Sequence, residues 1–210
     1  MKVSAGRNIA VLISGRGSNL KALLEACEEG TLDANICLVV SNKKNAGGLA
    51  HAEAYGVPSR VMSHIGYESR EAYENELIGV LEETGADVIV LAGFMRLLTG
   101  HFLAAFPNRV INIHPSILPA FPGVDAQRQA FEYGVRVSGC TVHFVDEGTD
   151  SGPVIDQAVV PVLPGDDRDT LAARILTQEH RILPRALSWL VSGRLEIRGR
   201  EVIVHEQNEK

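Results

Sequence analysis

The sequence lacks several features that would assign it to a specialised class of protein. Its 210 residues include only three cysteines, Cys27, Cys37 and Cys140, which lie far apart and form no Cys-x-x-Cys pair. We therefore expect neither a disulfide framework nor a zinc knuckle, and a reducing compartment suits the chain. No apolar run approaches the roughly 18 residues that indicate a membrane span, and the amino-terminal residues lack the apolar core of a signal peptide. A cytoplasmic protein with no membrane partner is expected.

An excess of positive charge is also missing. The chain has 26 Asp and Glu against 20 Lys and Arg, which gives a net charge of −6 with neutral histidines. This balance argues against a partner as acidic as nucleic acid. The seven histidines show no spacing typical of metal ligands, so no metal is expected.

What is present is the composition of a globular protein, with 45% hydrophobic and 22% charged residues. The chain is long enough to bury one large core. It contains no repeat, low-complexity stretch or evident linker. We therefore expect a single domain over residues 1–210.

The first half alternates strand-like apolar runs with helix-like segments. Strands are expected at residues 8–14, 36–41, 59–63, 87–92 and 109–114, and helices at 19–28, 46–55, 69–84 and 101–106. This alternation predicts an α/β fold with a Rossmann-like, doubly wound and mostly parallel sheet.

The second half breaks that alternation. After a helix at 123–133, strands at 140–145 and 154–162 follow each other with no helix between them, which predicts an antiparallel extension of the sheet. A long helix at 170–192 is expected to be interrupted or kinked near Pro184. A terminal hairpin is expected at residues 195–205.

The most informative residues are Asn112 and His114, at the end of a short apolar strand that Pro115 stops. Alternation along a strand puts both side chains on one face. An imidazole can move protons near neutral pH, and an amide can donate a hydrogen bond to a developing oxyanion. The pair is therefore a candidate reaction centre, with a satisfied polar pair at a strand end as the alternative.

A glycine-containing loop, residues 15–19, joins the first expected strand to the first expected helix. It lacks the third glycine of a dinucleotide fingerprint and the Gly-Lys-Ser/Thr of a P-loop. The loop indicates either a site for a single phosphate or a tight turn in which Asn19 caps the helix.

Two further segments have both a functional and a structural interpretation. The acidic residues 146–153 either form a solvated turn or supply a carboxylate that faces His114 and stabilises its imidazolium. Residues 93–98 follow an apolar strand at the edge where doubly wound sheets bind ligands. Their apolar side chains form either the floor of a site for a flat heterocycle or part of the core. His143, on an expected strand, is interpreted as a packed histidine.

Six segments span nearly the whole chain in order, namely ISGRGSN, SREAYE, VLAGFMRLL, NIHPSILPAFPG, VHFVDEGTDSGPVI and TQEH. Together they resemble the phosphoribosylglycinamide formyltransferase family, folate-dependent enzymes of purine synthesis. The resemblance implies a Rossmann-like sheet, 10-formyltetrahydrofolate as formyl donor and the amine of glycinamide ribonucleotide as acceptor, both small molecules.

The resemblance also implies roles for individual residues. Asn112 and the imidazolium of His114 would stabilise the oxyanion, and Asp150 would keep His114 protonated and oriented. The nucleotide side is implied to comprise Gly17, Ser18, Asn19 and Glu179. The folate side is implied to comprise Arg70, Met95, Arg96, Leu97, Leu98 and Asn112.

One departure from the family pattern is visible. After Pro-Gly the family often has Gly/Leu-His-x-His, where this chain has Val124-Asp125-Ala126-Gln127. The resemblance therefore assigns no role to Asp125 or Gln127.

Three alternatives stand beside this interpretation. A relative acting on methionyl-tRNA would carry a further carboxy-terminal domain and a more basic surface. A formyltetrahydrofolate hydrolase would carry an amino-terminal regulatory domain, for which the first expected strand leaves no room. A noncatalytic nucleotide-binding module would need residues 17–19 but not Asn112, His114 and Asp150 together. The oligomeric state is expected to be a monomer or a homodimer.

Overall fold

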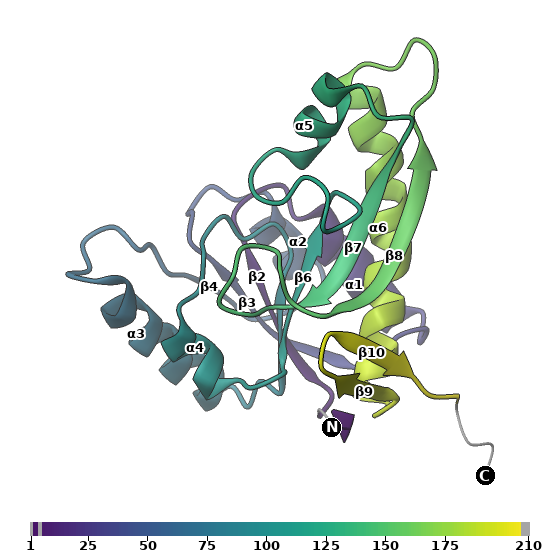
Figure 1. The fold of residues 1–210 in the computed structure, drawn as a ribbon. Helices are drawn as coiled ribbons and strands as arrows, with labels where there is room; N and C mark the ends of the chain where they lie inside the picture. The colour runs from purple at the N-terminus through teal and green to yellow at the C-terminus, as the bar shows by residue number, and fades with distance from the viewer. Residues whose placement is uncertain (1, 4–5, 207–210) are drawn as a thin grey trace.

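A central sheet of seven strands organises the molecule (Figure 1). The computed structural model describes residues 2–3 and 6–206. Residues 1–6, which were expected not to form a signal peptide, therefore lie partly outside the described residues. The strand order is β4-β3-β2-β5-β6-β7-β8; the first five are mutually parallel, and β7 and β8 are antiparallel to their neighbours. The predicted doubly wound, mostly parallel sheet with an antiparallel extension is confirmed.

The elements alternate along the chain as the apolar periodicity predicts. The parallel strands are β2 (Asn8–Ile13), β3 (Asn35–Ser41), β4 (Ser59–Val61), β5 (Val88–Leu91) and β6 (Val110–His114), followed by β7 (Val137–Phe144) and β8 (Val154–Pro161). The helices are α1 (Ser18–Glu28), α2 (Gly48–Ala54), α3 (Arg70–Glu83), α4 (Gly100–Ala105), α5 (Ala126–Tyr133) and α6 (Arg168–Val191). The carboxy-terminal hairpin of β9 (Leu195–Arg198) and β10 (Glu201–Val204) joins β1 (Lys2–Val3) in a small antiparallel sheet.

Strands β2, β3, β5 and β6 are mostly buried on both faces of the sheet. Helices α1, α2 and α6 contribute to one apolar cluster, which includes Leu23 and Leu187, and helices α3 and α4 contribute to the other, which includes Leu77 and Phe102. Strand β5 is buried at every position, which is why its sequence is an uninterrupted apolar run. No helix within residues 2–3 and 6–206 combines the length and apolar character that crossing a membrane requires.

Two expectations about helices differ from the structure. The helix expected from residue 123 begins only at Ala126, because residues up to Asp125 form a turn and Asp125 itself has a φ of 58°. Of the interruption or kink expected near Pro184, the interruption is wrong, since α6 runs from Arg168 to Val191 through Pro184. A proline inside a helix costs about 3 kcal/mol, and the buried neighbours of Pro184 along α6 offset that cost.

The chain reverses its direction of travel across the sheet at β2. It moves from β2 to β3 and β4 on one side, and then returns to place β5 on the other side of β2. In doubly wound sheets, ligands bind in the crevice at the carboxyl ends of the strands where this reversal occurs. The loops after β2, β5 and β6 therefore surround the expected position of a site.

Candidate active site

A cavity of about 1090 Å³ opens at the carboxyl ends of β2, β5 and β6. Its walls are segments 14–19, 91–98, 112–115 and 145–150, together with one face of the first three turns of α6. The loops that the sequence singled out after three different strands therefore border one space. Of the residues assigned to the site from sequence, Arg70 alone does not line it: it is exposed at the start of α3.

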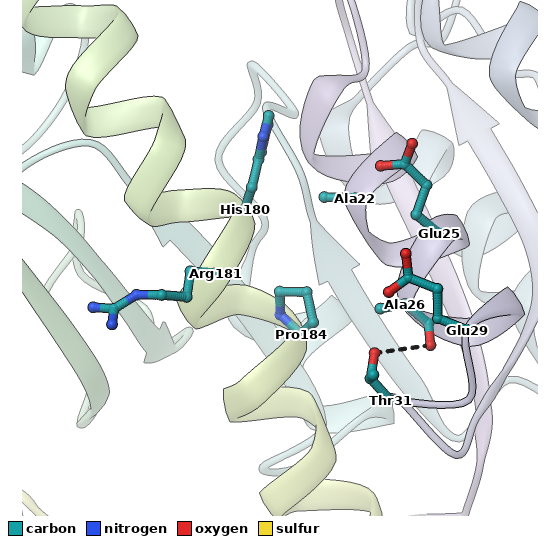
Figure 2. A pocket seen from close by; sticks show the side chains of 8 residues that line it. All are labelled: Ala22, Glu25, Ala26, Glu29, Thr31, His180, Arg181 and Pro184. Carbon is teal, nitrogen blue, oxygen red and sulfur yellow. Dashed lines mark hydrogen bonds between the residues drawn. The ribbon is translucent and has the colours of Figure 1, made fainter.

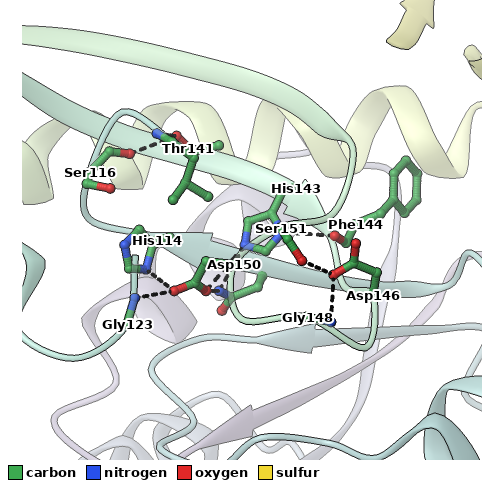
Figure 3. A network of polar contacts seen from close by, with 12 residues as sticks. His114, Ser116, Gly123, Thr141, His143, Phe144, Asp146, Gly148, Asp150 and Ser151 are labelled. Carbon is green, nitrogen blue, oxygen red and sulfur yellow. Dashed lines mark hydrogen bonds and ion pairs between the residues drawn. The ribbon is translucent and has the colours of Figure 1, made fainter. Parts of the chain in front are cut away.

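His114 and Asp150 form a close pair in this cavity (Figure 3). His114 Nδ1 lies 3.2 Å from Asp150 Oδ2, and the two side chains are only 6% and 15% exposed. The second ring nitrogen, Nε2, lies 2.9 Å from the carbonyl oxygen of Phe121. Because a carboxylate and a carbonyl can only accept, both nitrogens donate only when the ring is an imidazolium. The arrangement is therefore suited to a cationic His114.

Asp150 is held rigidly against the histidine. It adopts a φ of 50° in the acidic loop, and its Oδ2 accepts a hydrogen bond from the backbone of Gly123 at 2.7 Å. Its Oδ1 lies 3.4 Å from Asn112 Nδ2. The structure thus brings Asn112, His114 and Asp150 together, although Asp150 lies 36 residues after His114 in the sequence.

His143, which the sequence suggested was only a packed histidine, is part of the same network. Its Nε2 lies 3.2 Å from Asn112 Nδ2, and its Nδ1 lies 2.8 Å from the carbonyl oxygen of Phe144. Burial lowers the pKa of His143, so the neutral ring is favoured. The carbonyl can only accept, so Nδ1 carries the proton and Nε2 accepts from Asn112. The interaction fixes which way the Asn112 amide faces.

The glycine loop packs closely against the neighbouring loop. Gly17 has a φ of 76° and precedes α1, and a Cβ placed on it would lie 2.4 Å from the Cα of Gly48. Gly48 in turn donates a backbone hydrogen bond to the carbonyl of Gly15 at 3.1 Å. Glycine at position 17 therefore satisfies both the turn and the packing, and the first-turn N–H groups of α1 face the cavity end where an anion is favoured.

Asn19 does not cap α1, contrary to one of the two expectations for this loop. The capping residue is Gly17, and the Asn19 side chain instead donates to Glu179 Oε2 at 2.6 Å. Burial raises the pKa of the Glu179 carboxyl, and the hydrogen bond from Asn19 partly offsets that effect. The pair joins α1 to α6 at the edge of the cavity.

Ser14 connects three loops, and no sequence pattern indicated this role. Its hydroxyl accepts from Met95 N at 2.8 Å and donates to Asn42 Oδ1 at 2.7 Å. Its own backbone N–H donates to Gly93 O at 3.0 Å. A buried serine therefore fixes residues 93–95, which follow β5, against the ends of β2 and β3.

Residues 93–98 combine core and surface side chains, so both interpretations of this segment hold in part. Phe94 and Leu98 are buried, whereas Met95 is 64% and Leu97 57% exposed where they line the cavity. The Arg96 guanidinium lies 5.1 Å from the centre of the Tyr73 ring. The buried Glu74 carboxylate accepts from Thr99 N at 2.9 Å and so anchors the end of the segment.

Asp125 and Gln127 occupy the positions where the family pattern has histidines. Both line the cavity. The Asp125 carboxylate is paired with Arg128 and with Arg168 of α6, each at 3.2 Å. Asp125 therefore connects the start of α5 to the start of α6.

A second, smaller cavity of about 290 Å³ lies between α1 and α6 (Figure 2). Glu25, Glu29 and His180 line it, and the buried His180 Nε2 has no hydrogen-bond partner among the described residues. None of the candidate site residues lines this cavity. Within the described part of the chain, no group of three or more His, Cys, Asp or Glu side chains is arranged to hold a metal ion.

Comparisons with known proteins agree with this geometry. Residues 7–187 match the model of the formyl transferase family. The chain is 46% identical over 190 residues to phosphoribosylglycinamide formyltransferase of Escherichia coli, covering 90% of each chain. It is 50% identical over 189 residues to the trifunctional purine biosynthetic protein adenosine-3 of Drosophila melanogaster, which covers 89% of this chain but only 14% of that longer protein.

Solved structures show the same fold. Glycinamide ribonucleotide transformylase 1 from Symbiobacterium toebii superposes with a TM-score of 0.94 at 50% identity, covering 96% of this chain and 95% of that one. A formyltetrahydrofolate deformylase from Pseudomonas syringae superposes with a TM-score of 0.88 at 28% identity, covering 96% of this chain and 66% of that one. One fold is therefore shared by proteins named for transfer and for hydrolysis.

Proposed function

Because the chain belongs to the formyl transferase family, we propose that it transfers a formyl group from 10-formyltetrahydrofolate to the amine of glycinamide ribonucleotide, a step of purine biosynthesis. The observation that carries the proposal is the convergence of Asn112, His114 and Asp150 in one cavity. The names of the E. coli and Symbiobacterium relatives support the choice of acceptor.

The folate cosubstrate, when bound, supplies the carbonyl carbon that is transferred. The cavity suits such a molecule because exposed apolar side chains and a polar loop border the same space. We assign the folate side to Met95, Arg96, Leu97 and Leu98, together with Asn112. Arg70, which stands outside the cavity wall, is assigned by family resemblance alone.

We assign the nucleotide side to the glycine loop and α6. The backbone of Gly17 and the first turn of α1, including Ser18 and Asn19, favour a phosphate because helix-start N–H groups are unpaired donors. Glu179 is held by Asn19 at the same end of α1, where its carboxylate can accept from a ribose hydroxyl.

The catalytic roles follow from donor and acceptor chemistry. The Asn112 amide donates a hydrogen bond to the carbonyl oxygen under attack, and the positive charge of the His114 imidazolium stabilises the negative charge that develops there. Asp150 stabilises the imidazolium of His114 and fixes its ring plane. His143 keeps the donor side of the Asn112 amide inside the site. The amine nitrogen bonds to the formyl carbon, the bond from that carbon to the folate nitrogen breaks, and the proton lost by the amine reaches the departing folate nitrogen through water. Hydrogen bonds activate the carbonyl, so the proposal includes no metal.

The proposal extends to the setting of the enzyme. We propose a single formyltransferase domain in the cytoplasm, as a monomer or homodimer, whose partners are these small molecules rather than nucleic acid or a membrane. The net charge of −6 supports the exclusion of nucleic acid. The rival activity is hydrolysis of the folate, as the name of the Pseudomonas relative describes for that protein.

A purified-protein assay distinguishes these activities. Loss of 10-formyltetrahydrofolate is followed by the absorbance change of the folate, with glycinamide ribonucleotide present or absent. Consumption that depends on the ribonucleotide supports the proposal. Equal consumption with water alone assigns the protein to the hydrolases instead.

A further inference from the structure

His114, Thr141 and Gln157 occupy one row across three neighbouring strands. The antiparallel pairing places His114 of β6 opposite Thr141 of β7, and Thr141 opposite Gln157 of β8. Residues directly opposite each other in a sheet project to the same face. The row therefore brings two polar side chains alongside the histidine of the active site, and the catalytic roles above use neither of them.

The segment that follows His114 folds back over this row. Its Phe121 carbonyl accepts from His114 Nε2 at 2.9 Å, and the backbone N–H of Gly123 donates to Asp150 Oδ2 at 2.7 Å. Residues 115–123 therefore contact both members of the ion pair. The position of this segment determines where the second nitrogen of the imidazole points.

The Thr141 hydroxyl fastens this segment to the sheet (Figure 3). It is fully buried, donates to Ser116 O at 2.7 Å, and accepts from Leu118 N at 3.1 Å and from Gln157 Nε2 at 3.0 Å. A hydroxyl has one donor and two acceptor positions, so its whole capacity is used. Replacing the hydroxyl with a methyl group would leave a buried N–H and a buried carbonyl without this partner.

Gln157, on the next strand, also holds residues 115–123 against the sheet. Its Nε2 donates to Leu118 O at 2.9 Å as well as to Thr141 Oγ1. Gln157 is exposed, on the face of β8 that this segment partly covers. The neighbouring Asp156 instead pairs with Arg185 of α6, with Oδ2 2.7 Å from Arg185 Nη2. The Gln157 side chain can therefore be changed without disturbing the helix side of the sheet.

We propose that Thr141 and Gln157 are positioning residues for His114, which they orient through residues 115–121. Neither side chain lines the cavity, so neither contacts a substrate there. They hold the Phe121 carbonyl where it accepts from His114 Nε2. This contact fixes the orientation of the imidazole ring before substrates bind. The inference rests on the proposed function, because it requires His114 to act in formyl transfer.

The test compares four variants. Thr141→Val and Gln157→Met remove the polar groups at nearly constant size, Thr141→Ser keeps the hydroxyl, and Asp156→Asn is the matched control on β8. Misplacing a catalytic group by about 1 Å can cost on the order of 100-fold in rate. We expect the first two variants to lose about 10- to 100-fold in kcat with much smaller changes in either KM. Thr141→Ser and Asp156→Asn should remain close to the wild type.

A second readout does not depend on activity. The proton on His114 Nε2, assigned by its absence in His114→Ala, should give a downfield nuclear magnetic resonance signal because it is hydrogen-bonded. That signal should be lost through faster exchange in Thr141→Val and Gln157→Met and kept in the other two variants.

The outcomes separate this inference from the proposed function. Unchanged kcat and an unchanged Nε2 proton signal in folded Gln157→Met would overturn the positioning role, even if Thr141→Val failed to fold. A wild-type enzyme with no transfer activity would overturn the proposed function instead. The proton signal alone would then decide whether the two side chains hold the histidine.

Discussion

Asn112 and His143 lie directly opposite each other on the antiparallel strands β6 and β7, with Asn112 Nδ2 3.2 Å from His143 Nε2. The neutral histidine accepts and the amide donates, so the amide nitrogen faces the active site. Asp150 Oδ1 lies 3.4 Å from the same nitrogen. One of the two amide hydrogens is therefore directed at His143 and the other at Asp150 Oδ1, the more distant acceptor, which a substrate oxygen would replace.

The lowered pKa of His143 predicts a pH dependence of stability. Burial disfavours the charged ring, so the contribution of the neutral ring is fully present above the ordinary histidine pKa of about 6.5. It is lost as the pH falls through the lower value of the folded protein. His143→Gln keeps an acceptor for Asn112 but does not titrate. Thermal unfolding from about pH 8 to about pH 5 should show a smaller acid loss in this variant. Parallel curves for the two proteins would contradict the prediction.

Gly17→Ala should weaken both the fold and nucleotide binding. An alanine there adopts an unfavourable positive φ, at about 1–2 kcal/mol, and its Cβ would meet the backbone of Gly48 at 2.4 Å. Gly30→Ala is the matched control, because Gly30 has a φ of 74° but no atom within 4 Å of its added Cβ. Chemical denaturation should show the larger loss for Gly17→Ala, and only that variant should have a raised KM for the nucleotide. Equal KM values for the nucleotide in the two variants would show that the glycine loop is not part of the nucleotide site.

Glu179→Gln should impair nucleotide binding more than turnover. The carboxylate is buried and accepts from Asn19 at 2.6 Å, so the charge can be removed without leaving Asn19 unpaired. A hydrogen bond to a charged group is worth about 1.5–3 kcal/mol, which corresponds to a rise of about 10- to 100-fold in the nucleotide KM. Glu25→Gln, which removes a charge from the smaller cavity between α1 and α6 and not from the active-site cavity, is the control. An unchanged KM in folded Glu179→Gln would place the ribose elsewhere.

Gln127→Ala should leave kcat close to the wild-type value. Asp150 and Phe121 already occupy both nitrogens of His114, and the structure gives the Gln127 side chain no part in that network. Steady-state kinetics with both substrates checks this expectation. A loss of about 100-fold, the size expected for a positioned acid or base, would mean that Gln127 does the work of a family histidine.

The sequence was sufficient for the fold because the dominant signals are local. Apolar runs predicted β2 and β5, and Ser69 marked the start of α3, where its hydroxyl accepts from Ala72 N at 3.0 Å. Alternation along one strand was enough to pair Asn112 with His114. The interruption at Pro184 was predicted wrongly, because a local rule does not include the packing of α6 on the sheet.

The parts of the site that were missed depend on neighbours distant in sequence. His143 is significant only because β7 pairs with β6 in a register that sets it opposite Asn112. Ser14 is significant only because β2, β3 and β5 are adjacent. Helix capping was one of the two expectations for Asn19, and its actual partner Glu179 is 160 residues away. Strand register and helix docking carry this information, and neither can be deduced from a single stretch of sequence.

The proposed function requires His114 and Asp150 to act as one unit in formyl transfer. Asp150→Asn preserves size but removes the charge beside His114 Nδ1, so it should slow the chemical step by about 10²–10⁴. His114→Ala should be at least as damaging, while the affinities for folate and nucleotide change much less, since the lost interaction is strongest in the transition state.

The decisive measurement is single-turnover kinetics on Asp150→Asn, His114→Ala and the double variant, with binding measured separately. We expect the double variant to be little slower than His114→Ala, because residues acting as a unit give non-additive losses. Near-normal chemistry in folded Asp150→Asn, or fully additive losses in the double variant, would contradict it.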